Sequence, residues 1–168
     1  MKNIILIGMP GAGKSTVGVV LAKNLGMSFM DSDLVIQERK GKKLHELITE
    51  FGNDGFLRIE GEVNASLDVQ NTIIATGGSA VYSEEAMKHL KEIGIVVYLE
   101  LSEASIQERL GDLGKRGVVL PDGWTLTDLY NERVPLYQKY ADLVIRCDDR
   151  SIRTIVEVIG QQVEKMQR

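Results

Sequence analysis

The most informative stretch of this sequence is Gly8-Met9-Pro10-Gly11-Ala12-Gly13-Lys14-Ser15. It fits the pattern G-x-x-x-x-G-K-[ST] at every fixed position. A continuous apolar run at residues 3–7 precedes it, and residues 14–25 follow with apolar side chains at helical spacing. A strand, a glycine-rich turn and a helix in this order direct backbone N–H groups and a positive helix end at an anion. The stretch therefore predicts a loop that binds the phosphates of a nucleoside triphosphate.

Side chains in and after this loop complete a phosphate and metal site. Lys14 is placed to reach the β- and γ-phosphates, and Ser15 is placed to offer its hydroxyl to Mg²⁺. The alternative is a tight strand-to-helix turn with a chance lysine, and the agreement of the fixed positions with both flanks argues against it. With MgATP as the ligand, we predict nucleotide-binding roles for Gly11, Ala12, Gly13, Lys14, Ser15 and Thr16.

Apolar runs alternate with helical patterns along the whole chain. Strands are predicted at residues 3–7, 72–76, 95–99 and 143–146, with a shorter one at 29–30. Their continuous apolarity indicates strands buried on both faces, as in a parallel sheet. Helices are predicted at residues 14–25, 34–39, 44–51, 55–67, 84–92, 102–110, 125–140 and 151–166. Strands alternating with helices are typical of an α/β fold.

Length and composition limit the class of protein. The 168 residues suit one domain, which we expect to span residues 1–168. The net charge of −4 argues against nucleic-acid binding. The single cysteine, Cys147, cannot form an internal disulfide, and no apolar run approaches the ~20 residues of a membrane span. We expect a cytoplasmic, monomeric protein whose partners are small molecules rather than nucleic acid or membrane.

Two aspartates follow the short second strand, in Asp31-Ser32-Asp33. The carboxyl ends of strands are where α/β folds bind ligands, and residues two apart in an extended segment point to the same side. One carboxylate is then placed to hold the hydration shell of Mg²⁺, and the other to take the proton of an acceptor hydroxyl. A compatible alternative makes Asp33 the N-cap of the next helix.

Residues 111–124 contain four glycines and a proline, which makes both helix and strand unfavourable there. A plain surface connection is one interpretation of this segment. The other is a mobile lid that closes over a bound nucleotide.

These motifs together resemble the shikimate kinase family over essentially the whole chain. The resemblance rests on the phosphate loop, the Asp-x-Asp pair, the glycine pair Gly77-Gly78 and the sequence Arg133-Val134-Pro135-Leu136-Tyr137. It implies a three-layer P-loop kinase fold, with a five-stranded parallel sheet flanked by helices and a lid. It also implies an enzyme that uses ATP and Mg²⁺ to convert shikimate to shikimate 3-phosphate in aromatic amino acid biosynthesis.

The resemblance assigns roles on the nucleotide side of the site. Asp31 matches the aspartate near Mg²⁺, and Arg116 matches the lid arginine that reaches the phosphates. Arg109 and Arg150 match positions that flank the adenine. Lys14 and Arg116 are therefore expected to act in catalysis together with Asp33.

On the acceptor side, the resemblance places Asp33 at the acceptor hydroxyl and Arg133 at the substrate carboxylate. Gly77 and Gly78 match glycines that approach the substrate.

The sequence departs from the family pattern on this acceptor side. The family pattern Phe-Arg-x-x-Glu becomes Phe56-Leu57-Arg58-Ile59-Glu60, so leucine stands where an arginine grips the substrate carboxylate. Arg58, one position on, is the candidate to replace it, although it is rotated by ~100° around a helix. The third glycine of Gly-Gly-Gly is Ser79, and the lid sequence Arg-Pro-Leu-Leu becomes residues 116–119, Arg-Gly-Val-Val.

Three functional hypotheses fit these observations. The first is phosphorylation of shikimate, and the second is phosphorylation of a different hydroxylated small molecule by a related enzyme. The third is a nucleotide-binding regulatory domain with little catalysis, against which the retained Lys14, Ser15 and both aspartates argue. A GTPase switch is disfavoured because the sequence lacks Asn-Lys-x-Asp.

Overall fold

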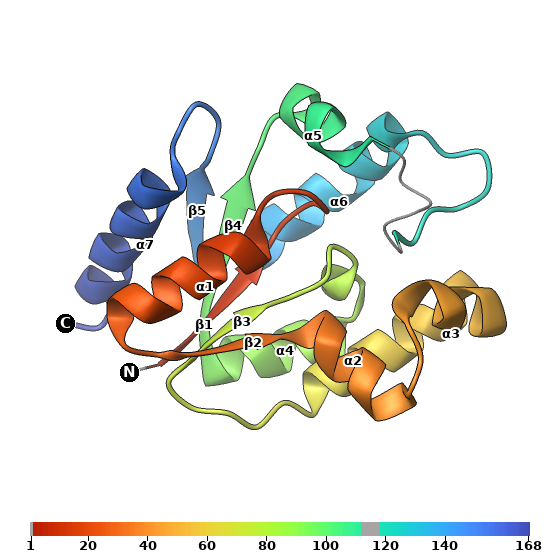
Figure 1. The fold of residues 1–168 in the computed structure, drawn as a ribbon, viewed down its shortest axis with the longest axis horizontal. Helices are drawn as coiled ribbons and strands as arrows, with labels where there is room; N and C mark the ends of the chain where they lie inside the picture. The colour runs from red at the N-terminus through yellow and green to blue at the C-terminus, as the bar shows by residue number, and fades with distance from the viewer. Residues whose placement is uncertain (1, 112–117) are drawn as a thin grey trace.

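The computed structural model describes residues 2–111 and 118–168. Its centre is a sheet of five parallel strands in the order β2-β3-β1-β4-β5 (Figure 1). The strands are β1 (Asn3–Ile7), β2 (Ser28–Asp31), β3 (Thr72–Ala75), β4 (Gly94–Glu100) and β5 (Leu143–Arg146). The predicted α/β fold with a five-stranded parallel sheet is confirmed.

Helices cover both faces of this sheet and form the outer layers. On one face α1 (Lys14–Leu25) packs against α7 (Ile152–Met166), and α4 (Glu84–Ile93) and α6 (Leu126–Tyr140) contact β4 from the other (Figure 1). The remaining elements are α2 (Ser32–Lys40), α3 (Leu44–Ala65), the 3₁₀ turn η1 (Ala80–Tyr82) and α5 (Glu103–Leu110).

The central strand β1 is the most deeply buried element. Ile4, Ile5 and Leu6 have no exposed surface, because β3 and β4 flank the strand and helices cover it. Burial of each such side chain contributes about 1.5–3 kcal/mol. The phosphate-binding loop therefore follows directly on the most deeply buried strand of the fold.

A second, smaller apolar cluster lies away from the sheet. It joins α2 and α3 to the segment after residue 117 and consists of Ile36, Leu47, Phe56, Val63 and Val119. Val119 is only 5% exposed, and the amide of Asn53 donates to the carbonyl of Leu120 at 3.2 Å. In the described end of the predicted lid, Val119 and Leu120 thus contact α3, whereas Val118 and Trp124 pack against the main core.

Two helix predictions differ from the structure in their limits. Helix α2 begins at Ser32, two residues before the predicted start, because the carboxylate of Asp31 caps it. The helices predicted at 44–51 and 55–67 correspond to the two parts of α3, which are separated by a kink at Gly52, where φ is 73° and ψ 174°; the second part ends at Ala65, two residues before its predicted end. Within residues 2–111 and 118–168, no helix has the length and apolarity needed to cross a bilayer.

Candidate active site

The phosphate-binding loop connects β1 to α1. Gly11 and Gly13 have φ values of 80° and 91°, in the left-handed region that favours glycine. Gly13 is the N-cap of α1 and offers no side chain to the first-turn N–H groups of that helix. Those groups remain directed outward, as an anion at a helix N-terminus requires. The loop geometry therefore fits the predicted phosphate site.

Lys14 lies against this loop. It is only 8% exposed, and its ammonium group donates to the carbonyls of Gly8 at 2.6 Å and Met9 at 2.9 Å. Burial lowers the pKa of Lys14 to about 8, although the negative charge of Asp33 opposes this shift. The side chain thus keeps its positive charge near neutral pH.

Asp31 joins the loop to the end of β2. Its Oδ2 accepts a hydrogen bond from the hydroxyl of Ser15 at 2.8 Å, and its Oδ1 accepts from the N–H of Asp33 at 2.9 Å. Asp31 is therefore the N-cap of α2, and the alternative that Asp33 caps this helix is wrong. A carboxylate and a hydroxyl oxygen side by side at the loop fit Mg²⁺, which binds through few protein oxygens plus phosphates.

Asp33 projects from the first turn of α2 into a cleft beside the loop. Burial, followed by the charge of Asp31, raises the pKa of Asp33 to about 6, while Lys14 opposes the shift. A general base works best when its pKa lies near the working pH. Asp33 is therefore suited to accept a proton from a hydroxyl bound in the cleft.

The cleft has a volume of about 440 Å³, which suits a small ligand. The carboxyl ends of β1, β2 and β3 meet at this cleft. The residues predicted to bind the nucleotide and those predicted to bind the acceptor therefore come together there. Its lining includes the predicted residues Gly11, Gly13, Lys14, Ser15, Thr16, Asp33, Gly77, Gly78 and Arg133, with Ala12 buried in the loop beneath.

Arg133 reaches this cleft from α6 and is only 1% exposed. One guanidinium nitrogen, Nη2, donates to the carbonyl of Val119 at 2.9 Å, and Nε donates to the hydroxyl of Tyr82 at 3.3 Å. The guanidinium carbon also lies 5.3 Å from the centre of the Tyr82 ring. These contacts hold the third nitrogen, Nη1, beside Gly78, where an added Cβ would lie 2.9 Å from it.

Glu60 was not among the predicted site residues, yet it lines the same cleft. It is 2% exposed, and its Oε1 accepts from the hydroxyl of Ser79 at 2.6 Å. Burial raises the pKa of Glu60 to about 7, against the hydrogen bond from Ser79, which lowers it. The sequence held a signal for this position, because Glu60 matches the glutamate of the family pattern Phe-Arg-x-x-Glu and shares a helix face with Phe56.

Some predicted residues lie elsewhere. Arg58 is exposed and borders a different hollow, together with Leu57, and is not among the residues that line the cleft. Its substrate role therefore stays a prediction without support from position. Arg116, the predicted lid arginine, lies outside the described residues.

The two arginines predicted near adenine lie around the ends of β4 and β5. Arg109 of α5 donates to the carbonyls of Gly11 and Ala12 at 3.4 and 3.5 Å, against the phosphate loop. Arg150 follows β5, and both arginines act electrostatically on Cys147. Burial nevertheless raises the pKa of the Cys147 thiol to about 11, so this cysteine stays protonated.

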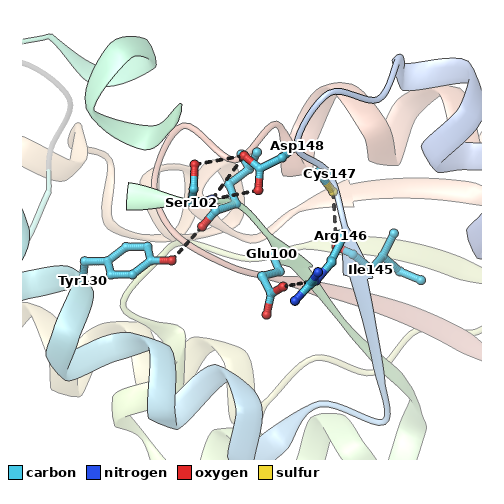
Figure 2. Close-up of polar contacts among 8 residues, drawn as sticks. Glu100, Ser102, Tyr130, Ile145, Arg146, Cys147 and Asp148 are labelled. Carbon is cyan, nitrogen blue, oxygen red and sulfur yellow. Dashed lines mark hydrogen bonds and ion pairs between the residues drawn. The ribbon is translucent and has the colours of Figure 1, made fainter. Parts of the chain in front are cut away.

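Polar contacts hold the chain at and after the end of β5, around Arg146 and Asp148, as Figure 2 shows. Asp148 accepts hydrogen bonds from the N–H of Ser102 at 3.0 Å and from its hydroxyl at 3.0 Å. Glu100 and Arg146 form an ion pair at 3.2 Å across the two strand ends. These contacts tie the chain after β5 to the start of α5.

The fold and cleft define a three-layer P-loop kinase, with a triphosphate loop on one side and a buried, charged acceptor cleft on the other. The shikimate kinase family model matches residues 10–164, and the chain belongs to this family.

Relatives and solved structures agree with this assignment. The shikimate kinases of Aliivibrio salmonicida and Vibrio cholerae are 39% and 38% identical to the chain over 167 residues, which cover 98% of this chain and 97% and 96% of those relatives. A structure titled as shikimate kinase from Acinetobacter baumannii in complex with shikimate has a TM-score of 0.88 at 31% identity, over 98% of this chain and 94% of that one. A deoxyadenosine kinase from M. mycoides, at 16% identity and a TM-score of 0.65 over 98% of this chain and 99% of that one, shares the fold.

Proposed function

We propose that this protein transfers the γ-phosphoryl group of ATP to a hydroxyl of shikimate. The observation that carries the proposal is that one cleft is lined by the phosphate loop, by Asp33 and by Arg133. Donor phosphates, acceptor hydroxyl and acceptor carboxylate each find a matching group there. Family membership and the similarity to known shikimate kinases support shikimate as the acceptor.

In this proposal each side chain has a separate task. The hydroxyl oxygen of the acceptor attacks the γ-phosphorus, the bond from that phosphorus to the β–γ bridging oxygen breaks, and ADP leaves. Asp33 receives the hydroxyl proton and passes it to solvent. Lys14 neutralises charge on the phosphates, and Arg133 holds the acceptor carboxylate through its guanidinium. From the family resemblance, we assign Arg116 to the phosphates as well.

Mg²⁺ belongs to this proposal because Ser15 and Asp31 present oxygen ligands side by side. When bound, the ion would neutralise phosphate charge and orient the phosphates for transfer. We also propose that residues 1–168 act as one catalytic domain and that residues 111–124 form its lid.

A second candidate is a related kinase with a different hydroxylated acceptor. The observation that favours it is the absence of an arginine at position 57, where Leu57 packs with the apolar cluster of α2 and α3. A lost arginine–carboxylate contact costs a few kcal/mol, or ~100-fold in affinity.

Purified protein with MgATP, offered shikimate and a panel of other hydroxylated metabolites, tests both candidates through ADP release. Turnover with shikimate at an ordinary kinase rate supports the proposal. Turnover with another acceptor alone would replace shikimate, and tight ATP binding without turnover on any acceptor would favour a regulatory domain. The Asp33→Asn variant serves as the control for contaminating kinases.

A further inference from the structure

The carboxylate of Asp148 joins the chain after β5 to the start of α5 (Figure 2). Its Oδ1 accepts hydrogen bonds from the hydroxyls of Ser105 at 2.7 Å and Ser102 at 3.0 Å, and its Oδ2 accepts from the N–H of Ser102 at 3.0 Å. The bond from Ser105 is the largest cause that lowers the pKa of Asp148, and burial opposes it. Asp148 is therefore ionised at neutral pH, and hydrogen bonds to an ionised acceptor are roughly twice as strong as neutral ones.

These bonds do more than cap α5. Ser102 is already the N-cap of this helix, since its hydroxyl accepts from the N–H of Ser105 at 3.2 Å. Asp148 binds the cap residue itself, from 46 positions further along the chain. Its contacts therefore fix where α5 lies relative to the turn after β5, in addition to ordering the first turn of the helix.

The turn that Asp148 anchors also carries Arg150. Asp149 has a φ of 58°, in the left-handed region, and the N–H of Arg150 donates to the carbonyl of Cys147 at 3.3 Å. The N–H of Cys147 donates in turn to the carbonyl of Glu100 at 2.9 Å, at the end of β4. The backbone of Arg150 is thus tied to the sheet through Cys147 and to α5 through Asp148.

The last turn of α5 lies against the phosphate loop. Nη1 of Arg109 donates to the carbonyl of Gly11 at 3.4 Å, and a Cβ added to Gly11 would lie only 2.9 Å from the Leu110 side chain. Arg109 and Arg150 both lower the pKa of the buried Cys147 thiol, so the two cations lie near the same strand end. Neither of these two arginines is among the residues that line the acceptor cleft.

Phosphates bound to this loop determine where the rest of the nucleotide must go. The γ-phosphate has to face Asp33 in the cleft, so the base lies on the opposite side of the loop, toward Arg109 and Arg150. A guanidinium group stacks well on the face of a planar aromatic ring. Two guanidinium groups can enclose a base only when their separation matches the thickness of one ring.

We propose that Asp148 is a positioning residue for the nucleotide base, because it holds the turn that carries Arg150 against the helix that carries Arg109. This inference rests on the proposed use of ATP and goes beyond it by assigning the residue that sets the width of the base site. The hydrogen bonds from Ser102 and Ser105 to Asp148 keep the two guanidinium groups at a separation that admits one aromatic ring.

Calorimetry with wild type, Asp148→Ala and Asp148→Asn tests this role with two probes in the presence of Mg²⁺: ADP, and inorganic tripolyphosphate, which has no base. Asp148→Ala is expected to weaken ADP binding by about 10-fold, while the affinity for tripolyphosphate stays within about twofold. Asp148→Asn keeps an oxygen that can accept from Ser105 and should recover part of the loss. In steady-state kinetics the KM for ATP should rise by a similar factor, and the KM for the acceptor should not change.

Asp142→Asn is the matched control, because Asp142 stands at the other end of β5 and makes contacts of the same kind. It accepts from the N–H of Val96 at 2.9 Å and from the ammonium group of Lys91 at 2.8 Å. Asp142→Asn is expected to lower the melting temperature, as Asp148→Asn does, without changing the affinity for ADP.

Three results would overturn the inference: unchanged ADP affinity in Asp148→Ala, an equal loss of affinity for ADP and tripolyphosphate, or an equal loss of ADP affinity in Asp142→Asn. The binding measurements need no acceptor. Absence of turnover with shikimate would therefore contradict the proposed function and leave the role of Asp148 to be decided by ADP binding alone.

Discussion

Gly77 is the position where one added carbon should affect catalysis most directly. In Gly77→Ala, the new Cβ would lie 2.7 Å from Oδ1 of Asp33 and 2.8 Å from Oε2 of Glu60. Ordinary carbon–oxygen contacts are about 3.3 Å or longer, so each carboxylate must retreat by roughly 0.5 Å. Misplacement of a reacting group by about 1 Å costs about 100-fold in rate. We therefore expect kcat/KM for the acceptor to fall by about 10- to 100-fold, or about 1.4–2.7 kcal/mol in transition-state free energy.

Steady-state kinetics with each substrate varied in turn measure this effect. The KM for ATP should stay within about threefold, because Gly77 follows β3 and the phosphate loop is formed by other residues. Gly160→Ala is the matched control: its Cβ would meet Leu25 at 3.8 Å, an ordinary contact, and alanine should stabilise α7 by up to about 1 kcal/mol. Retention of more than about a third of wild-type kcat/KM in Gly77→Ala, or an equal loss in ATP affinity, would refute the reasoning.

Three further predictions concern the same cleft. Asp33→Asn should abolish phosphoryl transfer in single-turnover assays while ATP binding, measured by calorimetry, stays nearly intact; retained transfer would remove Asp33 from its role as base. The pKa of Glu60 in the folded protein is raised from 4.5 to about 7. The protonated carboxyl therefore stabilises the folded state fully below pH 4.5, and this stabilisation is lost as the pH rises through 7. The free energy of unfolding of Glu60→Gln should therefore increase relative to wild type by on the order of 3 kcal/mol from pH 4.5 to pH 7. Urea unfolding at both pH values measures this change, and a difference that stays constant contradicts the shift. Leu57→Arg should raise shikimate affinity by up to about 100-fold, since Leu57 shares a hollow with Tyr82 and Val119, both of which contact Arg133; unchanged affinity in calorimetry would mean that another group already supplies this contact.

Much of the fold could be predicted because β1, β3 and β4 are buried on both faces, whereas the edge strands β2 and β5 are only partly buried. The apolar runs at residues 3–7 and 143–146 coincide with β1 and β5. Strand β2 was predicted only as the short stretch Phe29-Met30, because this edge strand of four residues is only partly buried and carries few apolar side chains. The two helices predicted within residues 44–67 match the two parts of α3, because the positive φ of Gly52 interrupts the helical geometry between them.

The site was predictable where a local motif carries it. The phosphate loop and the Asp-x-Asp pair are short in sequence; the structure brings the loop and Asp33 to one cleft, and Asp31 accepts a hydrogen bond from Ser15 of the loop. The sequence did not indicate that Asp31 rather than Asp33 caps α2, because both residues are good caps and only the start of the helix decides between them. The Ser79–Glu60 bond joins residues 19 positions apart, and no local pattern indicates such a contact.

The charges in the cleft are arranged for ligands rather than for one another. Lys14, Asp33, Glu60 and Arg133 are all buried or partly buried there, yet every ion pair between described residues lies outside the cleft. Charges held apart in this way cost stability in the free protein, as the raised pKa of both acids and the lowered pKa of Lys14 indicate. A ligand with phosphates for Lys14, a carboxylate for Arg133 and hydroxyls for the two acids would relieve all four at once. Binding energy from this match can align the acceptor hydroxyl with the γ-phosphate, so the electrostatic cost of these buried charges and the specificity of the enzyme have the same physical origin.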